Sequence, residues 1–363
     1  MDLTHILLLS RNQVYGTTDG QLIMPFSMFR DQLLGRDIRV TNVPTQSPED
    51  RTNAIRSAFE STAPPDIVIT IPHWSEPAEA LSAWFERTRR ETNPSKHILL
   101  DFYDQTSSPH YGVLPHLDLY IKSKALRDRS LYQQDFQGGF IYADFVARQW
   151  GFDLEDWHFG SKPDPDHAHK IVAGWNFGLT SRYHKMIRAS KRFPIPWKRR
   201  PIGLHFRIGT INRTDKEMEW YQYSRKKAAE FAHPLRESIK FSGNDRVSPK
   251  RYYAELYMSK FVYSPFGWGE VCYRDFEAVA AGATLIKPDM SHIETFPNIF
   301  RANETYLPVA WDMHDLVERS RALFDDPDRA NAMRKVARDT LDQSLRGTGF
   351  VEIIEDCIRR VMC

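Results

Sequence analysis

The sequence is poor in cysteine, which restricts both its redox setting and the kind of site it can carry. Its three cysteines, Cys272, Cys357 and Cys363, form no Cys-x-x-Cys pair and are odd in number. Neither a disulfide framework nor a zinc site is therefore predicted. Three reduced thiols in an intracellular protein are the simpler interpretation.

Long apolar runs and a net charge are also missing. No apolar run approaches the ~18 residues that a membrane-spanning helix needs. The opening MDLTHILLLS has an acid at Asp2, no basic leader and too short a run for a signal peptide, so it predicts a buried strand. With 49 basic and 47 acidic residues the formal net charge is +2, so attraction to nucleic acid or lipid has to come from local patches. We expect a cytoplasmic protein without a transmembrane segment.

The chain has 363 residues, enough for two hydrophobic cores, and its first half alternates short apolar runs with helical stretches. Runs rich in Ile, Leu and Val without strict alternation suit strands that are buried on both faces of a parallel sheet. This order of elements predicts an α/β fold with doubly wound sheets. The runs stand at 5–9, 66–71, 97–102 and 117–123, with a crossover helix predicted at 77–92.

The basic stretch 188–201, with Pro194 and Pro196 close together, is the best candidate for a linker. We therefore expect two Rossmann-like domains that face a central cleft: an N-terminal domain over 1–190, a linker over 191–200 and a C-terminal domain over 201–345. The last segment, 346–363, is expected as a helix that can pack back on the N-terminal domain. Beyond the linker, strands are predicted at 202–209, 239–242, 260–265 and 284–288, and helices at 220–233, 248–259, 313–324, 327–344 and 349–361.

The segment SPFGWGEVCYRDFEAVAAGATLIKPD, 264–289, joins a glycine-rich loop to a short helix, predicted at 273–281, and a strand. Gly267 and Gly269 let the backbone approach a ligand closely, and a helix N-terminus suits a phosphate. Glu277 lies about one turn inside the helix, where its carboxylate can accept hydrogen bonds from a ribose diol. The alternative is a structural pair between Arg274 and Glu277, with glycines that only shape a turn.

This segment resembles the donor-binding segment of nucleotide-sugar glycosyltransferases with the two-Rossmann GT-B fold, in particular exostosin-like and family-1-like bacterial members. In that family a glycine-rich loop precedes an E-A-x-A-x-G helix whose glutamate holds the donor ribose, and Glu277, Ala278, Ala280 and Gly282 match it. The likeness covers residues 200 to 310, and the N-terminal half is similar only in architecture. It implies a metal-independent glycosyltransferase that binds a nucleotide sugar, of the UDP or GDP type, without a cofactor.

RRPIGLHFRIGT, followed by Arg213, is similar to the opening strand and loop of the C-terminal domain in that family, where basic residues neutralise the diphosphate. Arg207 and Arg213 are the candidates for this role, and Arg207 is also a catalytic candidate because it would stabilise the leaving diphosphate. The predicted donor site comprises Arg207, Gly209, Thr210, Arg213, Gly267, Gly269, Glu270, Arg274 and Glu277.

The sequence departs from the family pattern at one position. Retaining members often carry a glutamate eight positions before the helix glutamate, and that position is Gly269 here, with Glu270 one residue late. Either the loop has another register or the first carboxylate is absent, as in many inverting members. Retention and inversion both stay open, with a weak preference for inversion.

An inverting transfer needs a base for the acceptor hydroxyl. Three side chains, Asp19, Asp104 and His73, follow N-terminal strands at the edge that would face the cleft. A loop Asp beside Gly is also a common turn former, so a structural role is the alternative. Lys122 and Lys124 end another strand, where they can reach an anion or extend along apolar surface toward water.

Two other clusters suggest other ligands. DPDHAHK, 164–170, has Asp and His at spacings that occur in metal sites, but prolines fix it as an extended loop and no strand precedes it, so no metal is predicted. The basic run from Arg182 to Arg200 can contact a membrane surface or a nucleic-acid backbone. It can equally be a solvated helix and linker between the domains.

Transfer of a sugar to an acceptor hydroxyl is the leading hypothesis, and a glycan, a lipid-linked glycan, a protein and a modified DNA base are all open as acceptor. A sugar-nucleotide 2-epimerase would keep the fold but would need paired acids around the sugar and no acceptor groove. A non-catalytic nucleotide-sugar-binding or scaffold protein is the third hypothesis, which Gly269 mildly favours. Donor turnover without acceptor, or binding without transfer, would distinguish them.

Overall fold

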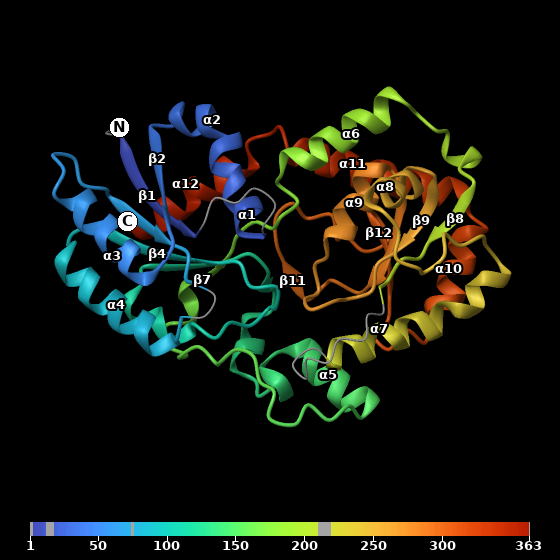
Figure 1. Ribbon diagram of the computed structural model, residues 1–363, viewed down its shortest axis with the longest axis horizontal. Coiled ribbons are helices and arrows are strands. Elements are labelled where there is room, and N and C mark those ends of the chain that lie inside the picture. Colours follow the sequence, from blue (N-terminus) through green and yellow to red (C-terminus); the bar gives the residue numbers. More distant parts are fainter. Residues whose placement is uncertain (1–2, 12–17, 74–75, 210–218, 363) are drawn as a thin grey trace.

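The computed structural model describes residues 3–11, 18–73, 76–209 and 219–362. Its main strands form a six-stranded sheet in the N-terminal half and a four-stranded sheet in the C-terminal half (Figure 1). Every pairing within these two sheets is parallel. The predicted α/β class with two doubly wound sheets is confirmed.

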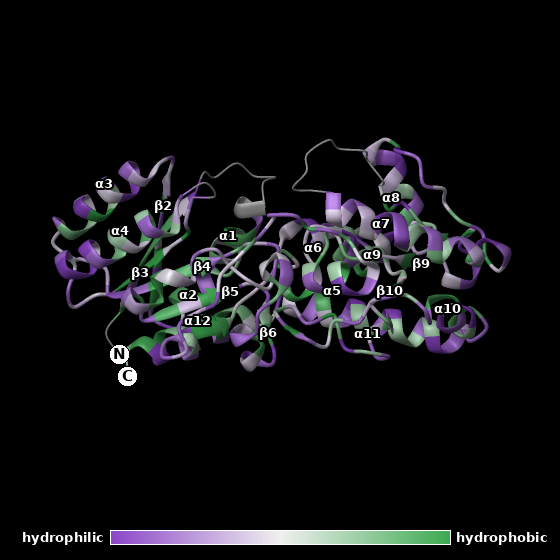
Figure 2. Cartoon of the chain, turned by 90° about the horizontal axis from the view of Figure 1, so that it is seen from below, coloured by the Kyte–Doolittle hydropathy of each residue, from purple (hydrophilic) through white to green (hydrophobic). Residues whose placement is uncertain are grey.

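The N-terminal sheet has the strand order β2-β1-β3-β4-β5-β7. Its central strands are buried on both faces, which the unbroken apolar runs predict, and Figure 2 shows them in the colour of hydrophobic residues. The strands are β1 (Thr4–Arg11), β2 (Ile38–Thr45), β3 (Ile67–Thr70), β4 (Lys96–Asp101), β5 (Leu119–Lys122) and β7 (Ile171–Ala173), and the helices are α1 (Thr18–Met28), α2 (Arg30–Leu34), α3 (Pro48–Phe59), α4 (Ala78–Glu91) and α5 (Ile141–Trp150).

The C-terminal sheet has the order β12-β10-β9-β8. The helix predicted at 273–281 coincides with α9, which ends at Gly282 in the left-handed conformation, φ 73°. Ser248 caps α8, as its hydroxyl accepts from the backbone nitrogen of Arg251 at 3.3 Å. The strands are β8 (Ile202–His205), β9 (Ser259–Tyr263), β10 (Thr284–Pro288) and β12 (Tyr306–Val309), and the helices are α7 (Glu219–Ala232), α8 (Pro249–Tyr257), α9 (Tyr273–Ala281), α10 (Leu316–Phe324) and α11 (Pro327–Ser344).

Two predicted strands of this half differ from the structure. The stretch 239–242 is not a strand, because only Phe241 forms an isolated bridge, to Leu204. The strand predicted at 202–209 ends at His205, and the chain then leaves the sheet. Both differences have one cause: an apolar run becomes a strand only where a neighbour offers a continuous row of hydrogen bonds.

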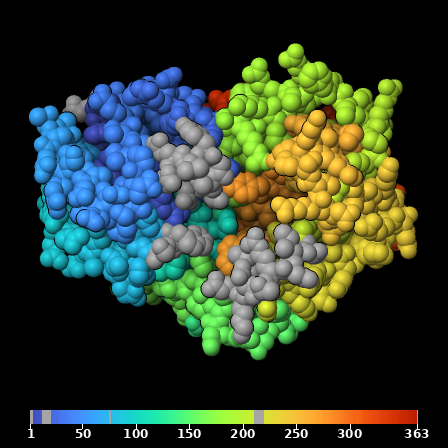
Figure 3. Space-filling model, viewed as in Figure 1, coloured from blue at the N-terminus to red at the C-terminus, as the bar shows by residue number. Residues whose placement is uncertain are grey.

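The two halves are joined by more than the linker. Strand β6 (Ala125–Leu126) of the first half pairs antiparallel with β11 (Ile293–Glu294) of the second. One hydrophobic cluster also runs through both halves and includes Ile6 of β1 and Phe276 of α9. In the space-filling view a hollow remains between the blue N-terminal half and the yellow-to-orange C-terminal half (Figure 3).

Two helices cross between the halves. Helix α6 (Ser181–Arg192) occupies the first two positions of the segment predicted as a linker and leads into the C-terminal half. Helix α12 (Gly349–Met362), red in Figure 1, returns to the N-terminal half. There the ring of Phe350 packs against those of Phe26 and Trp175, with ring centroids 5.3 Å and 4.9 Å apart. No helix of the described ranges is long and apolar enough to span a membrane.

Candidate functional site

The glycine loop (264–269) between β9 and α9 is in close contact with neighbouring side-chain and backbone atoms. A Cβ at Gly267 would lie 2.8 Å from Nη2 of Arg225, and a Cβ at Gly269 would lie 2.2 Å from the carbonyl oxygen of Asp104. Gly267 therefore leaves space for the guanidinium of Arg225, and Gly269 leaves space for the backbone of Asp104 in the N-terminal half. Only glycine leaves room for these approaches without a shift of the neighbours.

Two arginines converge on this loop and on the end of β8. Nη1 of Arg225, from α7, donates to the carbonyl of Gly209 at 3.4 Å, and Nη2 of Arg274, from α9, donates to the carbonyl of Arg207 at 2.7 Å. Neither guanidinium forms a salt bridge within the part of the chain that the structure describes. The Nε atom of each is buried without a hydrogen-bond partner there. Burial lowers the pKa of Arg225, and the positive charge of Arg274 adds to this.

The N-terminus of α9 lies at the same place. Its first turn is held by Asp275, which accepts from the backbone nitrogen of Cys272 at 2.8 Å and forms a fully buried ion pair with Lys287 at 3.1 Å. This pair fixes the start of the helix, whose macrodipole adds positive potential. Two arginines and a helix N-terminus together make a site for an anion.

Arg207 is occupied by protein groups. It is buried and donates to both carboxylate oxygens of Glu255 and to the carbonyls of Ser242 and Asp245. These four hydrogen bonds leave one of its five N–H groups, so little capacity remains for a diphosphate. The hydrogen bonds to Glu255 raise its pKa. The contacts of Arg207 indicate a structural role and not the predicted catalytic one. Arg225 is the better candidate for stabilising a leaving diphosphate.

Glu277 is buried and bound on both oxygens. Its Oε1 accepts from Arg182 and from the hydroxyl of Tyr253 at 3.1 Å, and its Oε2 accepts from the hydroxyl of Tyr252 at 2.7 Å. Its ion-pair partner is Arg182 of α6 and not Arg274, so the sequence-based alternative of an Arg274–Glu277 pair is wrong. Because a carboxylate oxygen accepts two hydrogen bonds, Oε2 has room for one more donor.

Glu270 and Asp104 lie where the two halves meet. Glu270 is fully buried, its Oε1 accepts from Thr106 at 3.3 Å and lies 3.8 Å from Nε2 of His292, and its Oε2 has no partner in the described ranges. The Asp104 side chain is 39% exposed, and its Oδ1 lies 3.5 Å from Nζ of Lys124. Asp104 is thus the base candidate that the structure brings against the glycine loop.

The other candidates lie apart from this contact or outside the described residues. Thr210 and Arg213 are outside them, and so is the side chain of Asp19, whose backbone belongs to α1. His73 donates its backbone N–H to Glu76 at 3.4 Å, and burial and the nearby Arg51 lower its pKa. Gly209 is exposed and has φ 64°, a conformation that favours glycine.

Lys122 and Lys124 do not reach toward solvent. Both side chains are fully buried, and Lys122 pairs with the buried Asp101 at 3.2 Å. Burial in such a place is tolerated because each ammonium has a carboxylate beside it. The predicted alternative that these lysines extend toward water is therefore wrong.

The stretch 164–170 forms a turn in which Oδ1 of Asp164 accepts from the backbone nitrogen of Asp166 at 2.9 Å. No group of three or more metal-ligating side chains occurs among the residues that the structure describes.

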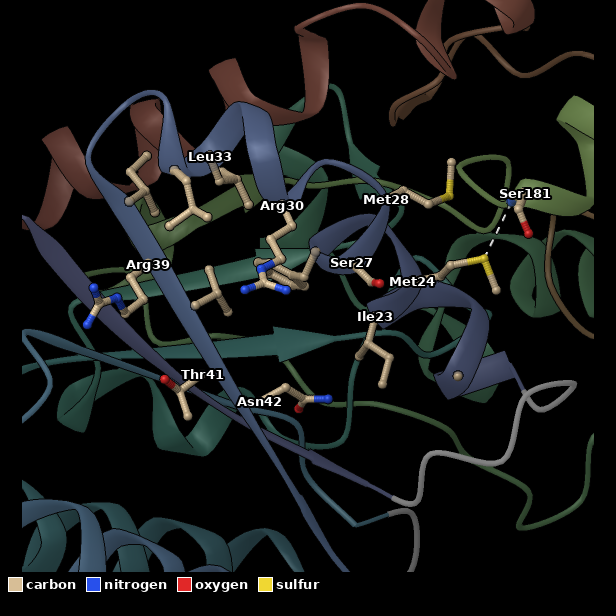
Figure 4. A pocket seen from close by; sticks show the side chains of 15 residues that line it. Ile23, Met24, Ser27, Met28, Arg30, Leu33, Arg39, Thr41, Asn42 and Ser181 are labelled. Carbon is tan, nitrogen blue, oxygen red and sulfur yellow. Dashed lines mark hydrogen bonds between the residues drawn. The ribbon is translucent and has the colours of Figure 1, made fainter.

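A cavity of about 870 Å³ lies elsewhere, between α1, α2 and β2 (Figure 4). There Met24 accepts from the backbone nitrogen of Ser181 at 3.4 Å, and no described residue of the predicted donor site lines the cavity.

Solved structures match nearly the whole chain at low sequence identity. A glycosyltransferase from Rickettsia africae is 14% identical, with 100% of this chain and 99% of that one covered and a TM-score of 0.48. A sucrose-phosphate synthase from Thermosynechococcus elongatus is 12% identical, with 99% of both chains covered and a TM-score of 0.47. A putative UDP-N-acetylglucosamine 2-epimerase from Listeria monocytogenes is 11% identical, with 98% and 96% covered and a TM-score of 0.46.

A scan against protein-family models gave no match, and neither did a search of curated proteins. Sequence reasoning missed the two side chains that matter most, Arg225 and Arg182. They come from α7 and α6, where each stands in a basic run with no local mark of a site.

Proposed function

We propose that the chain is a glycosyltransferase that moves a sugar from a nucleoside-diphosphate sugar to an acceptor hydroxyl. The observation that carries the proposal is the pair Arg225 and Arg274, which meet at the ends of β8 and β9 without a carboxylate partner in the described ranges. The positive charge of Arg225 is the costly one, because burial lowers its pKa and no carboxylate pairs with it in the described ranges, whereas nearby Tyr252, Cys272, Glu277 and Asp275 raise the pKa of Arg274 against its burial. A diphosphate beside the N-terminus of α9 would supply the opposite charge.

The remaining donor contacts follow from this placement. Oε2 of Glu277 would accept one ribose hydroxyl in addition to Tyr252, so the ribose contact is a single hydrogen bond unless Arg182 moves away. The arginines supply the charge that stabilises the leaving diphosphate, so the proposal includes neither metal nor cofactor.

For the reaction, Asp104 is proposed as the general base. It would take the proton of the acceptor hydroxyl while that oxygen forms a bond to the anomeric carbon, and the bond from this carbon to the diphosphate oxygen breaks. The displaced electron pair passes to the diphosphate between Arg225 and Arg274. Position 269, where retaining relatives often carry a glutamate, has no space for a side chain against Asp104, which supports inversion.

A binding screen tests the donor site first. Thermal shift and calorimetry with UDP, GDP and the parent nucleosides should identify one diphosphate that binds. The variant Arg225→Gln should weaken its binding by roughly 10- to 100-fold, since a charge-assisted contact is lost, and should leave nucleoside binding unchanged. Lys227→Gln is the matched control, because Lys227 lies on the same helix but pairs with Glu230 at 3.3 Å.

Two further variants separate binding from chemistry. Glu277→Gln should weaken nucleotide and nucleoside alike, and Asp104→Asn should keep donor affinity but lower the transfer rate by roughly 10²- to 10⁴-fold. Unchanged nucleotide affinity in both Arg225→Gln and Glu277→Gln would show that the donor site is assigned wrongly.

The two alternatives give other products. A 2-epimerase would convert the donor to an isomer without any acceptor, and a non-catalytic binding or scaffold protein would bind the donor and transfer to no acceptor. Anomeric analysis of the product by NMR distinguishes inversion from retention in the same assay.

A further inference from the structure

A cavity of about 540 Å³ opens beside the glycine loop, where both halves of the chain contribute to its walls. Its volume is in the range of small-molecule sites, roughly 300–1,000 Å³. The N-terminal half contributes Tyr103, Pro109 and the segment 152–159 that follows α5, and the C-terminal half contributes Glu219, Trp220 and Trp268. Because Trp268 stands between Gly267 and Gly269, the cavity adjoins the loop to which the donor is assigned.

Three tryptophans form one wall of this cavity. The ring centroids of Trp157 and Trp220 are 5.3 Å apart, and Trp268 lies 5.8 Å from each of them. Trp157 and Trp268 are partly exposed, so parts of their surfaces are open to a ligand. The negative π face of an aromatic ring attracts the slightly positive C–H groups on the face of a pyranose, which makes such a wall suitable for a sugar ring.

Trp220 carries a hydrogen-bond donor that the protein does not satisfy. The residue is 1% exposed, and its Nε1 is buried without an acceptor in the described part of the chain. A buried donor in this state costs free energy, which a ligand recovers only if its binding uncovers Nε1 and brings an acceptor. A sugar hydroxyl is such an acceptor, and it also donates to carboxylates nearby.

The charged residues of the cavity are mostly acidic. Four exposed carboxylate residues, Asp153, Glu155, Asp156 and Glu219, stand among the described lining residues, against the single His158. Carboxylates accept hydrogen bonds from hydroxyls, and their charge repels phosphate, sulfate and uronate groups. Aromatic faces with acidic surroundings thus favour a neutral, hydroxyl-rich ligand over an anionic one.

We propose that this aromatic–acidic cavity, lined by Trp157, Trp220 and Trp268, binds the acceptor and that the acceptor is a neutral carbohydrate. The inference rests on the proposed function only in calling the bound sugar an acceptor. Binding of a neutral sugar to this cavity does not itself depend on glycosyl transfer. The inference removes a modified DNA base from the acceptors that the sequence leaves open, and it restricts the glycans to neutral ones. A free oligosaccharide and the sugar end of a glycoconjugate present the same chemistry to this cavity.

Tryptophan fluorescence titration of the full chain tests the proposal without nucleotide. The probes are short neutral hexose oligosaccharides, the same chains with a phosphate or uronate group, and a neutral glycan on a lipid carrier to separate the two sources. Neutral probes should bind, and anionic ones should bind at least ~10-fold more weakly at low salt, with the gap closing at high salt. Trp157→Ala should weaken neutral binding by ~10-fold and Trp157→Phe should largely restore it.

Asp156→Asn is a variant on the exposed surface, where a change is tolerated by the fold, and it should narrow the gap between neutral and anionic probes. The proposal is overturned if no neutral oligosaccharide binds, if anionic probes bind equally well at low salt, or if Trp157→Ala binds as wild type does. Nucleotide binding, measured in parallel by thermal shift, reports on the donor site alone. Failure of the proposed function would appear there, while the fluorescence titration is decided separately.

Discussion

His205 is fully buried at the end of β8, among charged neighbours. Neither of its ring nitrogens has a hydrogen-bond partner in the described ranges, and its ring meets that of Tyr252 edge-on at 5.1 Å. Burial lowers its pKa to about 3, and the positive charges of Arg274 and Arg207 add to this against the opposing effect of Glu255. The imidazole is therefore neutral in the folded protein across the physiological range.

This residue makes the fold sensitive to acid. Above pH 6.5 the histidine is neutral in both states and contributes nothing, whereas below it the unfolded chain gains a proton that the folded chain does not. Stability is thus lost as pH falls from 6.5 toward about 3, by ~1.4 kcal/mol per pH unit. His205→Phe keeps a ring against Tyr252 and should flatten that part of the dependence. Denaturant unfolding at pH 7.5, 6 and 5 measures it, and parallel curves for the two proteins would contradict the assignment.

His97 shows the same behaviour at a second place. It is buried in β4, and burial lowers its pKa to about 4. Its Nε2 is 2.8 Å from the hydroxyl of Thr92, so this histidine has one partner where His205 has none. A residual acid dependence in His205→Phe is therefore expected from His97.

At the scale of elements, the loop after β4 and the loop after β9 touch through Asp104 and Gly269. Their contact is extended by a hydrogen bond from Nε2 of Gln105 to the carbonyl of Trp268 at 3.2 Å. The two loops bring the proposed base, the donor loop and the aromatic wall to one place. Because a backbone oxygen stands 2.2 Å from the position of a Cβ at 269, this contact has no space for any side chain there.

Gly269→Ala should therefore destabilise the protein by ~1–3 kcal/mol and lower its melting temperature, since the two loops must separate. Gly267→Ala is the matched control, because the atom in its way is the end of the flexible Arg225 side chain and not backbone. It should change stability by less than half as much. Equal melting temperatures for wild type and Gly269→Ala would show that the contact is loose.

How well the elements could be predicted depends on where their signals lie. Helix α9 and strands β9 and β10 follow from the sequence because a glycine loop, a glycine stop and apolar runs are all local. Strand β2, IRVTNVPT, was not predicted, because an edge strand is covered on one side only and its mixture of polar and apolar residues carries no clear pattern. The stretch 239–242 shows the reverse error, an apolar run without a continuous partner.

The residues of the candidate site show the same contrast between local and distant signals. Glu277 and the glycine loop could be found from a contiguous motif, whereas the contacts that decide their chemistry are distant in the sequence. Arg182 is 95 positions from Glu277, and Glu270 meets Thr106 across 164 positions. Such pairs depend on how the halves are placed against each other, which no local pattern specifies.

On the scale of the whole molecule, the halves are held together at several points. The β6–β11 pair is extended by Arg127, whose backbone nitrogen donates to the carbonyl of His292 at 2.8 Å. The shared hydrophobic cluster and α12 add to this contact. A large hinge opening would break apolar contacts and hydrogen bonds together, so exchange of ligands is expected through movements of loops.

The basic run from Arg182 to Arg200 divides into structural ends and an exposed middle. Arg182 binds Glu277, and Arg200 is buried with hydrogen bonds to the carbonyls of Ser259 at 2.8 Å and Ala281 at 2.9 Å. Between them Phe193 is 72% exposed and Ile195 is 39% exposed. Six exposed basic residues flank these two apolar side chains in the sequence: Lys185, Arg188, Lys191, Arg192, Lys198 and Arg199. Two of them are paired, Lys191 with Asp342 at 2.7 Å and Lys198 with Asp328 at 3.7 Å.

Exposed apolar side chains among basic residues are the pattern of a peripheral membrane contact, because the apolar groups enter the interface while the cations attract anionic headgroups. We propose this contact for the segment. Phe193→Ser with Ile195→Ser should lower binding to vesicles that contain anionic lipid by roughly 5- to 10-fold in sedimentation assays. Phe231→Ser, a 38% exposed phenylalanine on α7, is the matched control and should bind as wild type does. Equal vesicle binding by the double variant, or binding to single-stranded nucleic acid in place of vesicles, would assign the segment to another partner.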